Sequence, residues 1–302
     1  MNSWTPLVLA TLGWGASSVL TRAIILQGVD TYTLLPMRMI FAMLTLGLTI
    51  LFTRRFGTRS RLAWKRGLVL GTVAMAFPMF LMTLALEDLP VSLGGLLIAL
   101  IPIATIGAAH FIVEGERFQP KSLPGLLVAL AGSAVLVGIG GDSVAGVGNL
   151  WRGVALITSG VVIAGVGGAY SRKYALEVPS EDLVLPQFTV NTVVLLLLSP
   201  MVGQFDVTSI NAASWWMLLG VGAIGTTLAF ASFLIAAGVN PASRLALTGY
   251  SVPVVAVALA VVFLGEVLTP AILGGAVLIV GGVILAERAT PHVPVAGVFD
   301  SR

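Results

Sequence analysis

Apolar stretches of membrane-spanning length recur along the whole chain and are separated by short polar breaks. A bilayer core ~30 Å thick needs about 20 mostly apolar residues per helix. The segments that meet this requirement are residues 5–25, 33–52, 67–86, 92–113, 121–140, 151–171, 183–204, 214–236, 242–264 and 270–287. No break is long enough for a soluble domain. The pattern predicts an all-α membrane protein with ten transmembrane helices.

The composition excludes a soluble globular class. Of 302 residues, 57% are apolar and 10% are charged, whereas a soluble domain carries about 25% charged residues. The net charge of +3 is too small to indicate a nucleic-acid groove. The absence of cysteine excludes disulfides, thiolate nucleophiles and Cys-ligated metals. Because Met1 to Ser3 lack the basic region of a cleaved signal peptide, we interpret the first apolar stretch as a transmembrane helix.

The basic residues predict the orientation in the membrane, since cytoplasmic loops hold the excess of Lys and Arg. With the N-terminus inside, thirteen of the sixteen fall on the inner side, six of them between the second and third spans. Arg22, Arg38 and Arg152 remain near the outer side. We therefore expect a multi-pass protein of a bacterial inner, or plasma, membrane with both termini in the cytoplasm.

An internal repeat appears when the chain is compared with itself at an offset of 150 or 151 residues. The matched pairs include Gly15 with Gly165, Arg22 with Arg172, Pro36 with Pro186, Trp64 with Trp215, Pro90 with Pro241, Pro102 with Pro253, and Gly115-Glu116 with Gly265-Glu266. Each unit holds five spans, an odd number, so the second must enter the membrane with the opposite orientation. Inverted repeats are typical of secondary transporters, whose substrate site lies between the halves. We predict repeats at 1–140 and 141–287, followed by a cytoplasmic tail at 288–302.

The repeat resembles the EamA branch of the drug/metabolite transporter superfamily. The likeness covers about residues 5–287 and rests on Leu12-Gly13-Trp14-Gly15, Arg38, Pro102 with Gly115-Glu116, and Pro253 with Gly265-Glu266. It implies a central cavity lined by spans 1, 3, 4, 6, 8 and 9, with the other four packed outside. Within the family, the overall pattern is most similar to aromatic amino acid exporters of the YddG type.

Candidate substrate ligands are aromatic and hydroxyl residues on the spans that the resemblance places around the cavity. They are Trp14, Ser17, Phe77, Phe80, Tyr170, Thr227, Phe230, Thr248, Tyr250 and Ser251. Such neutral donors and acceptors suit a zwitterionic or uncharged amphipathic solute. For each of them, packing in the core or against lipid is the alternative.

Arg38, Pro78, Pro102 and Pro253 are candidate gate or hinge residues. Arg38 lies about five residues into its predicted span, roughly 7–8 Å deep. It could snorkel to the interface, bind carbonyls freed by a neighbouring proline, or gate the pathway. The prolines each remove a backbone hydrogen bond, and their bends could be packing kinks or paired hinges. His110 and Glu114 share a helix face near the inner interface. His110 is either a hydrogen-bonded interfacial side chain or a proton sensor at the cytoplasmic mouth.

Few other charges lie deep in the spans, and the acidic residues lie at span ends where they can reach headgroups or water. Small multidrug antiporters of the same superfamily carry a mid-helix glutamate in the first span, but here that region reads Thr11-Leu12-Gly13-Trp14. This argues against carboxylate-based proton exchange. Gln187 and Asn191, one turn apart, are expected to join helices. The glycine faces at Gly67 and Gly71, and at Gly125 and Gly132, fit close helix packing in a monomer, and would also fit a homodimer.

The function that the sequence favours is secondary export of small amphipathic metabolites, aromatic and other large apolar amino acids first, by alternating access. Other metabolites or drugs are the alternative substrates. A membrane enzyme is disfavoured because no GxSxG, HExxH or paired mid-span aspartate occurs. A passive channel would need a continuous polar lining or a charged ring. We expect a small-molecule substrate and the lipid bilayer as partners, and no metal, cofactor or nucleic acid.

Overall fold

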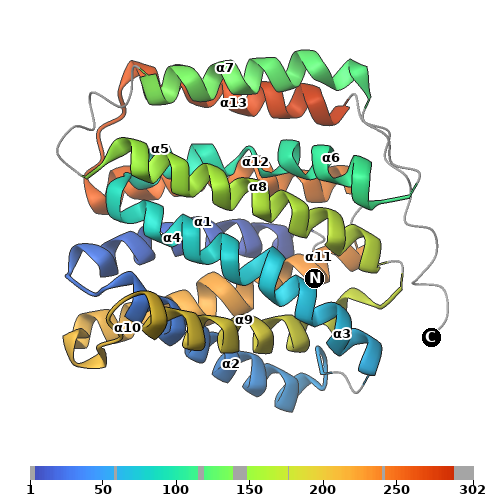
Figure 1. Cartoon of the computed structure of the whole chain (residues 1–302), viewed down its shortest axis with the longest axis vertical. Coiled ribbons are helices and arrows are strands. Elements are labelled where there is room, and N and C mark those ends of the chain that lie inside the picture. Colours follow the sequence, from blue (N-terminus) through green and yellow to red (C-terminus); the bar gives the residue numbers. More distant parts are fainter. Residues whose placement is uncertain are drawn as a thin grey trace. The chain divides into compact units, whose positions relative to one another are not determined.

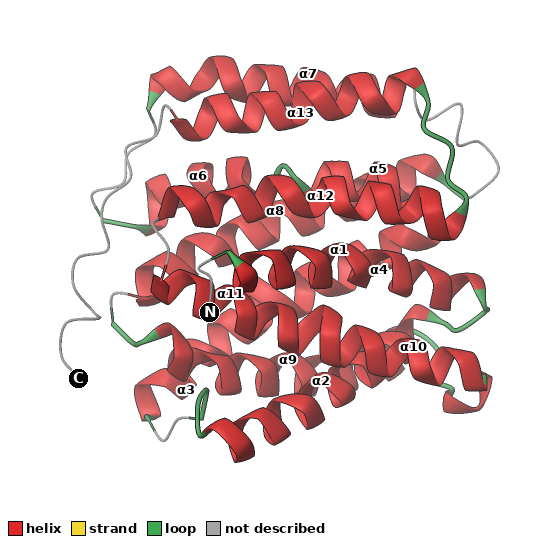
Figure 2. Cartoon of the chain, turned by 180° about the vertical axis from the view of Figure 1, so that it is seen from behind, coloured by secondary structure: helices red, strands yellow, loops and turns green. Residues whose placement is uncertain are grey.

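All regular elements in the described part of the chain are helices (Figure 2). The computed structural model describes residues 4–57, 60–114, 119–138, 148–175, 177–239 and 242–288. Within these residues, eight helical segments are long and apolar enough to cross a membrane, and two shorter apolar helices, Ser251–Leu264 and Pro270–Ala286, lie within the last two predicted spans. Inside a bilayer the backbone must satisfy its own hydrogen bonds, which is why such segments become helices. The predicted fold class is confirmed.

The first five spans begin with α1 (Thr5–Leu26) and α2 (Thr31–Thr53). The third consists of α3 (Arg61–Val69), the π-helix η1 (Leu70–Ala76) and α4 (Phe77–Asp88). The fourth is divided into α5 (Val91–Ile98) and α6 (Ile101–Ile112), and the fifth comprises the short 3-10 helix η2 (Pro120–Ser122) and α7 (Leu123–Gly138).

The second five spans begin with α8 (Leu150–Ala175) and α9 (Ser180–Val202), followed by a loop with the 3-10 helix η4 (Val207–Ser209). The eighth span consists of α10 (Ala212–Gly222), the π-helix η5 (Ala223–Leu228) and α11 (Ala229–Val239). The last two are α12 (Ala242–Leu264) and α13 (Pro270–Arg288). The third and eighth spans, which are repeat mates, thus carry π-helices at equivalent positions.

The two repeat-related prolines act differently on their helices. Pro102 is the second residue of α6, after a break at Ala99 and Leu100, where its missing amide removes no helix hydrogen bond. Pro253 lies inside α12, which continues through it. The proline therefore coincides with an interruption in one repeat only, and the hinge role of Pro78, Pro102 and Pro253 stays a prediction.

The chain forms two compact units, and each draws on both sequence repeats. Unit 1 comprises residues 1–72 and 180–265, and unit 2 comprises residues 73–179 and 266–302. Unit 1 thus holds spans 1, 2, 7, 8 and 9 with the start of span 3, whereas unit 2 holds spans 4, 5, 6 and 10 with the rest of span 3. Helices of one repeat bury their small-residue faces against helices of the other, so packing and sequence divide the chain differently.

In unit 2, α7 and α13 lie side by side (Figures 1 and 2). A Cβ added at Gly125 would lie 2.3 Å from the amide nitrogen of Ala286, and one at Gly132 would lie 2.8 Å from that of Ile279. As the residue number rises along α7, the number of its partner on α13 falls, so the helices run antiparallel. Because they are repeat mates, this direction is the one that inverted repeats require.

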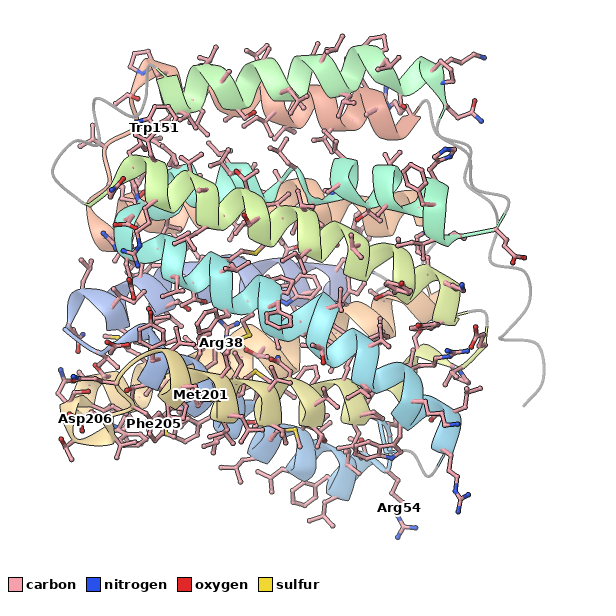
Figure 3. All side chains as sticks on the ribbon, viewed as in Figure 1. Arg38, Arg54, Trp151, Met201, Phe205 and Asp206 are labelled. Atoms are coloured by element: carbon pink, nitrogen blue, oxygen red, sulfur yellow. The ribbon has the colours of Figure 1, made fainter. Side chains whose placement is uncertain are left out.

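In unit 1, the repeat mates α2 and α9 also run antiparallel. Asn191 donates to the sulfur of Met39 at 3.5 Å, which confirms it as a contact between helices. Beyond the C-terminal end of α9, the Asp206 amide donates to Thr33 near the start of α2 at 2.9 Å, and beyond the other end of α2, Arg55 pairs with Glu181. Figure 3 accordingly shows Arg54 at the opposite end of these helices from Met201 and Asp206.

Equivalent close contacts occur once in each unit and confirm the register of the repeat. In unit 1, a Cβ at Gly15 would lie 2.5 Å from Val255, and in unit 2 one at Gly165 would lie 2.4 Å from Ala104. Gly15 and Gly165 are 150 residues apart, and Ala104 and Val255 are 151 apart. The chain therefore contains two inverted repeats.

Three expectations about organisation stay predictions. The boundaries at 140/141 and 287/288 are not tested, and residues 139–147 and 289–302 lie outside the described part of the chain. The central cavity is likewise an expectation. The glycine faces at Gly67 and Gly125 pack within the chain, against Pro186 and Ala286 respectively, and the oligomeric state stays a prediction.

Candidate functional site

Arg38 lies deeper in its helix than the sequence indicated. Because α2 begins at Thr31, Arg38 is seven residues from its start, about 10 Å along the axis. Figure 3 shows it well away from Arg54, which caps the other end of α2. A charge at such depth is costly and usually marks function.

The guanidinium of Arg38 is held by hydroxyl groups of two other helices. Its Nε donates to Thr226 Oγ1 of η5 at 3.0 Å, and its Nη1 lies 3.5 Å from Thr21 Oγ1 of α1. Thr226 Oγ1 in turn donates to the carbonyl oxygen of Val221 at 2.9 Å. Arg38 thus anchors α2 to α1 and η5, as expected for a structural role, but through hydroxyls and not through carbonyls freed by a proline. Snorkelling of its side chain to the interface stays a prediction, as does its gating role.

The positive charge of Arg38 has no negative partner in the part of the chain that the structure describes. Its polar contacts there are the two threonine hydroxyls. Among the described carboxylates, Glu181 pairs with Arg55, and Glu87 and Asp88 pair with Arg152. Hydroxyls can orient a guanidinium, but they leave its charge uncompensated.

Close backbone approach fixes η5 between α1 and α2. A Cβ at Gly225 would lie 2.8 Å from Ser17 Cβ, and one at Gly222 would lie 2.7 Å from the carbonyl oxygen of Arg38. Thr227, a predicted substrate ligand, is 2% exposed and donates to the carbonyl oxygen of Ala42 at 2.7 Å. Its hydroxyl therefore ties η5 to α2, and a substrate contact would have to replace that bond.

One face of α1 carries an aromatic ring and then two hydroxyls. Trp14, Ser17 and Thr21 follow at helical spacing. Ser17 and Thr21 are buried, whereas Trp14 and Arg38 each keep part of their surface exposed. Trp14 packs against Phe233 with ring centroids 5.3 Å apart. Within this group, Trp14 and Arg38 are the side chains that keep exposed surface.

The remaining predicted ligands of unit 1 lie on α11 and α12. Phe230 makes an edge contact with Phe188, with centroids 5.4 Å apart. Thr248 is 3% exposed, and its Oγ1 has no hydrogen-bond partner in the described structure. Ser251 is half-buried on α12, and the side chain of Tyr250 lies outside what the structure describes.

Unit 2 holds the other predicted ligands. Phe77 is 40% exposed and Phe80 is buried, both on α4, whereas Tyr170 packs against Tyr174 on α8 with centroids 5.6 Å apart. Pro78 is buried on α4, and Pro102 is half-buried on α6. The structure thus brings Ser17, Arg38 and Thr227 together around η5. Substrate binding by these residues, or by the predicted ligands of unit 2, stays a prediction.

Glu266 has a structural role that the sequence interpretation missed. Both of its carboxylate oxygens accept backbone hydrogen bonds at the start of α5, from Val91 at 2.7 Å and from Ser92 at 2.9 Å. A carboxylate there satisfies free amides and complements the helix dipole. We had expected it to reach headgroups or water. The Gly-Glu pair that occurs in both repeats was the available signal, and the positive φ of Gly265 makes the turn.

Asp88, also expected at the water interface, is buried. It is 7% exposed, accepts from the Asn149 amide at 2.9 Å and lies 3.1 Å from Arg152. Its carboxylate therefore joins the end of α4 to the start of α8. His110, on α6, is exposed and makes an edge contact with the neighbouring Phe111 ring. A proton-sensing role of His110 stays a prediction.

The model of the EamA-like transporter family matches the chain twice, over residues 5–138 and 151–287. The chain belongs to the EamA-like transporter family. This confirms the coarser part of the resemblance and identifies an integral, multi-pass membrane transporter. The narrower likeness to YddG-type exporters is not shown.

Two curated relatives are similar to this EamA-family chain at low identity. The uncharacterized transporter YvbV of Bacillus subtilis is 27% identical over 209 residues, which are 68% of this chain and 66% of YvbV. The probable terminal-alkyne amino-acid exporter of Streptantibioticus cattleyicolor is 27% identical over 221 residues, 73% of this chain and 72% of that protein. The chain thus spans slightly less than two thirds of YvbV. Both relatives are described as transporters or exporters, not as enzymes.

A solved structure, described only as the crystal structure of a protein, shares the fold of this EamA-family member. The superposition has a TM-score of 0.63 at 22% identity, and it covers 94% of this chain and 99% of the other. At that identity the likeness extends to the fold alone.

Proposed function

We propose that this EamA-family transporter exports small amphipathic metabolites, aromatic and other large apolar amino acids first, by alternating access between its inverted repeats. The observation that carries this proposal is the group around η5, in which the partly exposed Trp14 and Arg38 stand beside buried hydroxyls. Aromatic surface with a few fixed polar groups suits a solute that is apolar at one end and polar at the other.

The similarity to a protein named as an amino-acid exporter supports the same substrate class. The narrower likeness to YddG-type aromatic amino acid exporters is part of this proposal. So is the orientation, with both termini in the cytoplasm of a bacterial inner membrane. Coupling to protons through a mid-span carboxylate is not part of it, because the sequence places its acidic residues at span ends.

Transport by the purified protein in proteoliposomes tests the proposal. We expect saturable uptake of labelled phenylalanine and leucine, and faster uptake when the vesicles contain unlabelled phenylalanine, because a carrier exchanges substrates. Labelled aspartate serves as the polar control and should not enter. Flux that rises linearly with concentration and shows no exchange would indicate a channel. Transport of other metabolites but of neither amino acid would contradict the substrate class.

The same vesicles with and without a pH gradient test the driving force. We expect the initial rate to follow the substrate gradient alone. A rate that depends strongly on the proton gradient would show a coupling group that the span sequences do not reveal.

A further inference from the structure

We infer that Arg38 is the carboxylate-binding group of the transporter, so that its substrates carry a carboxylate next to an apolar side chain. This inference rests on the proposed function and narrows it to anionic and zwitterionic acids. The first observation is the uncompensated charge. Both described partners of the guanidinium are neutral hydroxyls, and no carboxylate among the described residues pairs with it.

The second observation is the orientation of the guanidinium. Nε and Nη1 are directed to Thr226 and Thr21, which fix the plane of the group. A guanidinium has five N–H donors in a planar fork that matches a carboxylate. Two threonine acceptors leave most of these donors available, and part of the Arg38 surface is exposed. A carboxylate could therefore bind in a charge-assisted, two-point geometry.

The third observation comes from the other repeat, where the equivalent π-helix forms although the residue equivalent to Arg38 is uncharged. The repeat mate of Arg38 is Phe188, which is fully buried and packs against Phe230. The mates of Thr226 and Thr227 are Met75 and Ala76, yet η1 is a π-helix like η5. The irregular helix therefore does not require an arginine beside it. A deep charge that the architecture does not need is best explained by a ligand.

Paired acids and amides test the inference by transport. The wild-type protein is expected to transport phenylalanine with a much lower KM than phenylalaninamide. Arg38→Gln should raise the KM for phenylalanine by about 10- to 100-fold, the effect of losing a charge-assisted hydrogen bond, and leave that for the amide within about twofold. Arg38→Lys, which keeps the charge but not the fork, should fall between wild type and Arg38→Gln.

Thr226→Val separates recognition from packing. It removes the hydroxyl between Arg38 and Val221 but leaves the charge in place. If Arg38 binds the carboxylate, Thr226→Val keeps part of the preference for acid over amide, because the charge and the Thr21 contact remain, although the protein is less stable. If Arg38 only braces η5, then Arg38→Gln and Thr226→Val should impair acid and amide alike, and that result would overturn the inference.

Ligand binding gives a second readout that does not depend on transport. We expect 3-phenylpropionate, and not 3-phenylpropanamide, to raise the melting temperature of the purified wild-type protein, and Arg38→Lys to retain part of this shift. Equal shifts with both compounds, no shift with the acid, or a full shift in Arg38→Gln would each contradict the carboxylate site. If the acid stabilises the protein but no amino acid is transported, the proposed function fails and the carboxylate site stands.

Discussion

The two π-helices, η1 and η5, have the same backbone conformation but different side chains. In η5, Thr226 and Thr227 donate to the carbonyls of Val221 and Ala42, and Thr226 also accepts from Arg38. The equivalent residues of η1 are Met75 and Ala76. Each π-helix nevertheless has a glycine in close contact with a neighbouring helix, Gly222 directly before η5 and Gly71 within η1.

Comparing the two π-helices distinguishes features that serve packing from features that serve function. What the repeats share is the shape of the third and eighth spans and the glycines that allow their approach. What they do not share is the series of hydrogen bonds that ends at Arg38, whose charge has no carboxylate partner among the described residues. The shared packing does not require the charge of Arg38, and a charge at that depth in a span usually marks function.

The largest expected effect comes from filling the shared glycine contacts. A Cβ at Gly222 would lie 2.7 Å from the Arg38 carbonyl, and one at Gly71 would lie 2.7 Å from that of Gln187. Because backbone cannot move aside cheaply, Gly222→Ala and Gly71→Ala should each lower the free energy of unfolding by about 1–3 kcal/mol. Thermal unfolding in detergent measures both.

Gly47→Ala is the matched control, since a Cβ there meets nothing within 4 Å. It should be neutral or slightly stabilising, as alanine is the better helix former. A large loss in only one of the two test variants would show that the π-helices are not equivalent in packing.

A smaller effect is expected from removing one hydroxyl in each π-helix. Thr226→Val leaves Arg38 Nε without its 3.0 Å acceptor, which should cost about 1–3 kcal/mol, toward the lower end because part of the Arg38 side chain is exposed. Thr72→Val in η1 removes only a local bond to the carbonyl of Leu68 and should change stability by about 0.5 kcal/mol or less. Melting temperatures of the two variants, compared under one condition, test this difference. Equal losses would mean that the series of hydrogen bonds in η5 contributes no more than an ordinary helix hydroxyl.

The smallest effect on stability is expected in the loops before the third and eighth spans. The loop before the third span is basic, whereas the loop before the eighth contains Asp206. Hydrogen bonds from the Thr208 hydroxyl and amide hold the pKa of Asp206 below its ordinary value. The stability that these bonds contribute is therefore present above the unfolded pKa, about 4, and is lost as the pH falls through the lower folded pKa. Melting curves should show a small advantage of wild type over Asp206→Asn above the ordinary pKa of aspartate, and this advantage should diminish as the pH falls below it. An advantage that grows toward low pH would reverse the sign and refute the assignment.

The sequence by itself determined the spans, the repeat and its inversion. Span lengths follow from the bilayer thickness, and an odd number of spans per repeat leaves no other orientation. It also pointed to Arg38, because a charge inside an apolar segment is visible without coordinates.

Only the tertiary structure decided which groups meet. Glu266 lies 174 residues along the chain from Ser92, and Arg38 lies 188 from Thr226, so no local pattern could pair them. The division into two packing units that mix the repeats was hidden for the same reason, since it depends on which small-residue faces approach across the fold. Hydropathy along the sequence determines how far each helix extends. The hydrogen-bond partner of each polar group depends on three-dimensional distances between helices, which the linear sequence pattern does not specify.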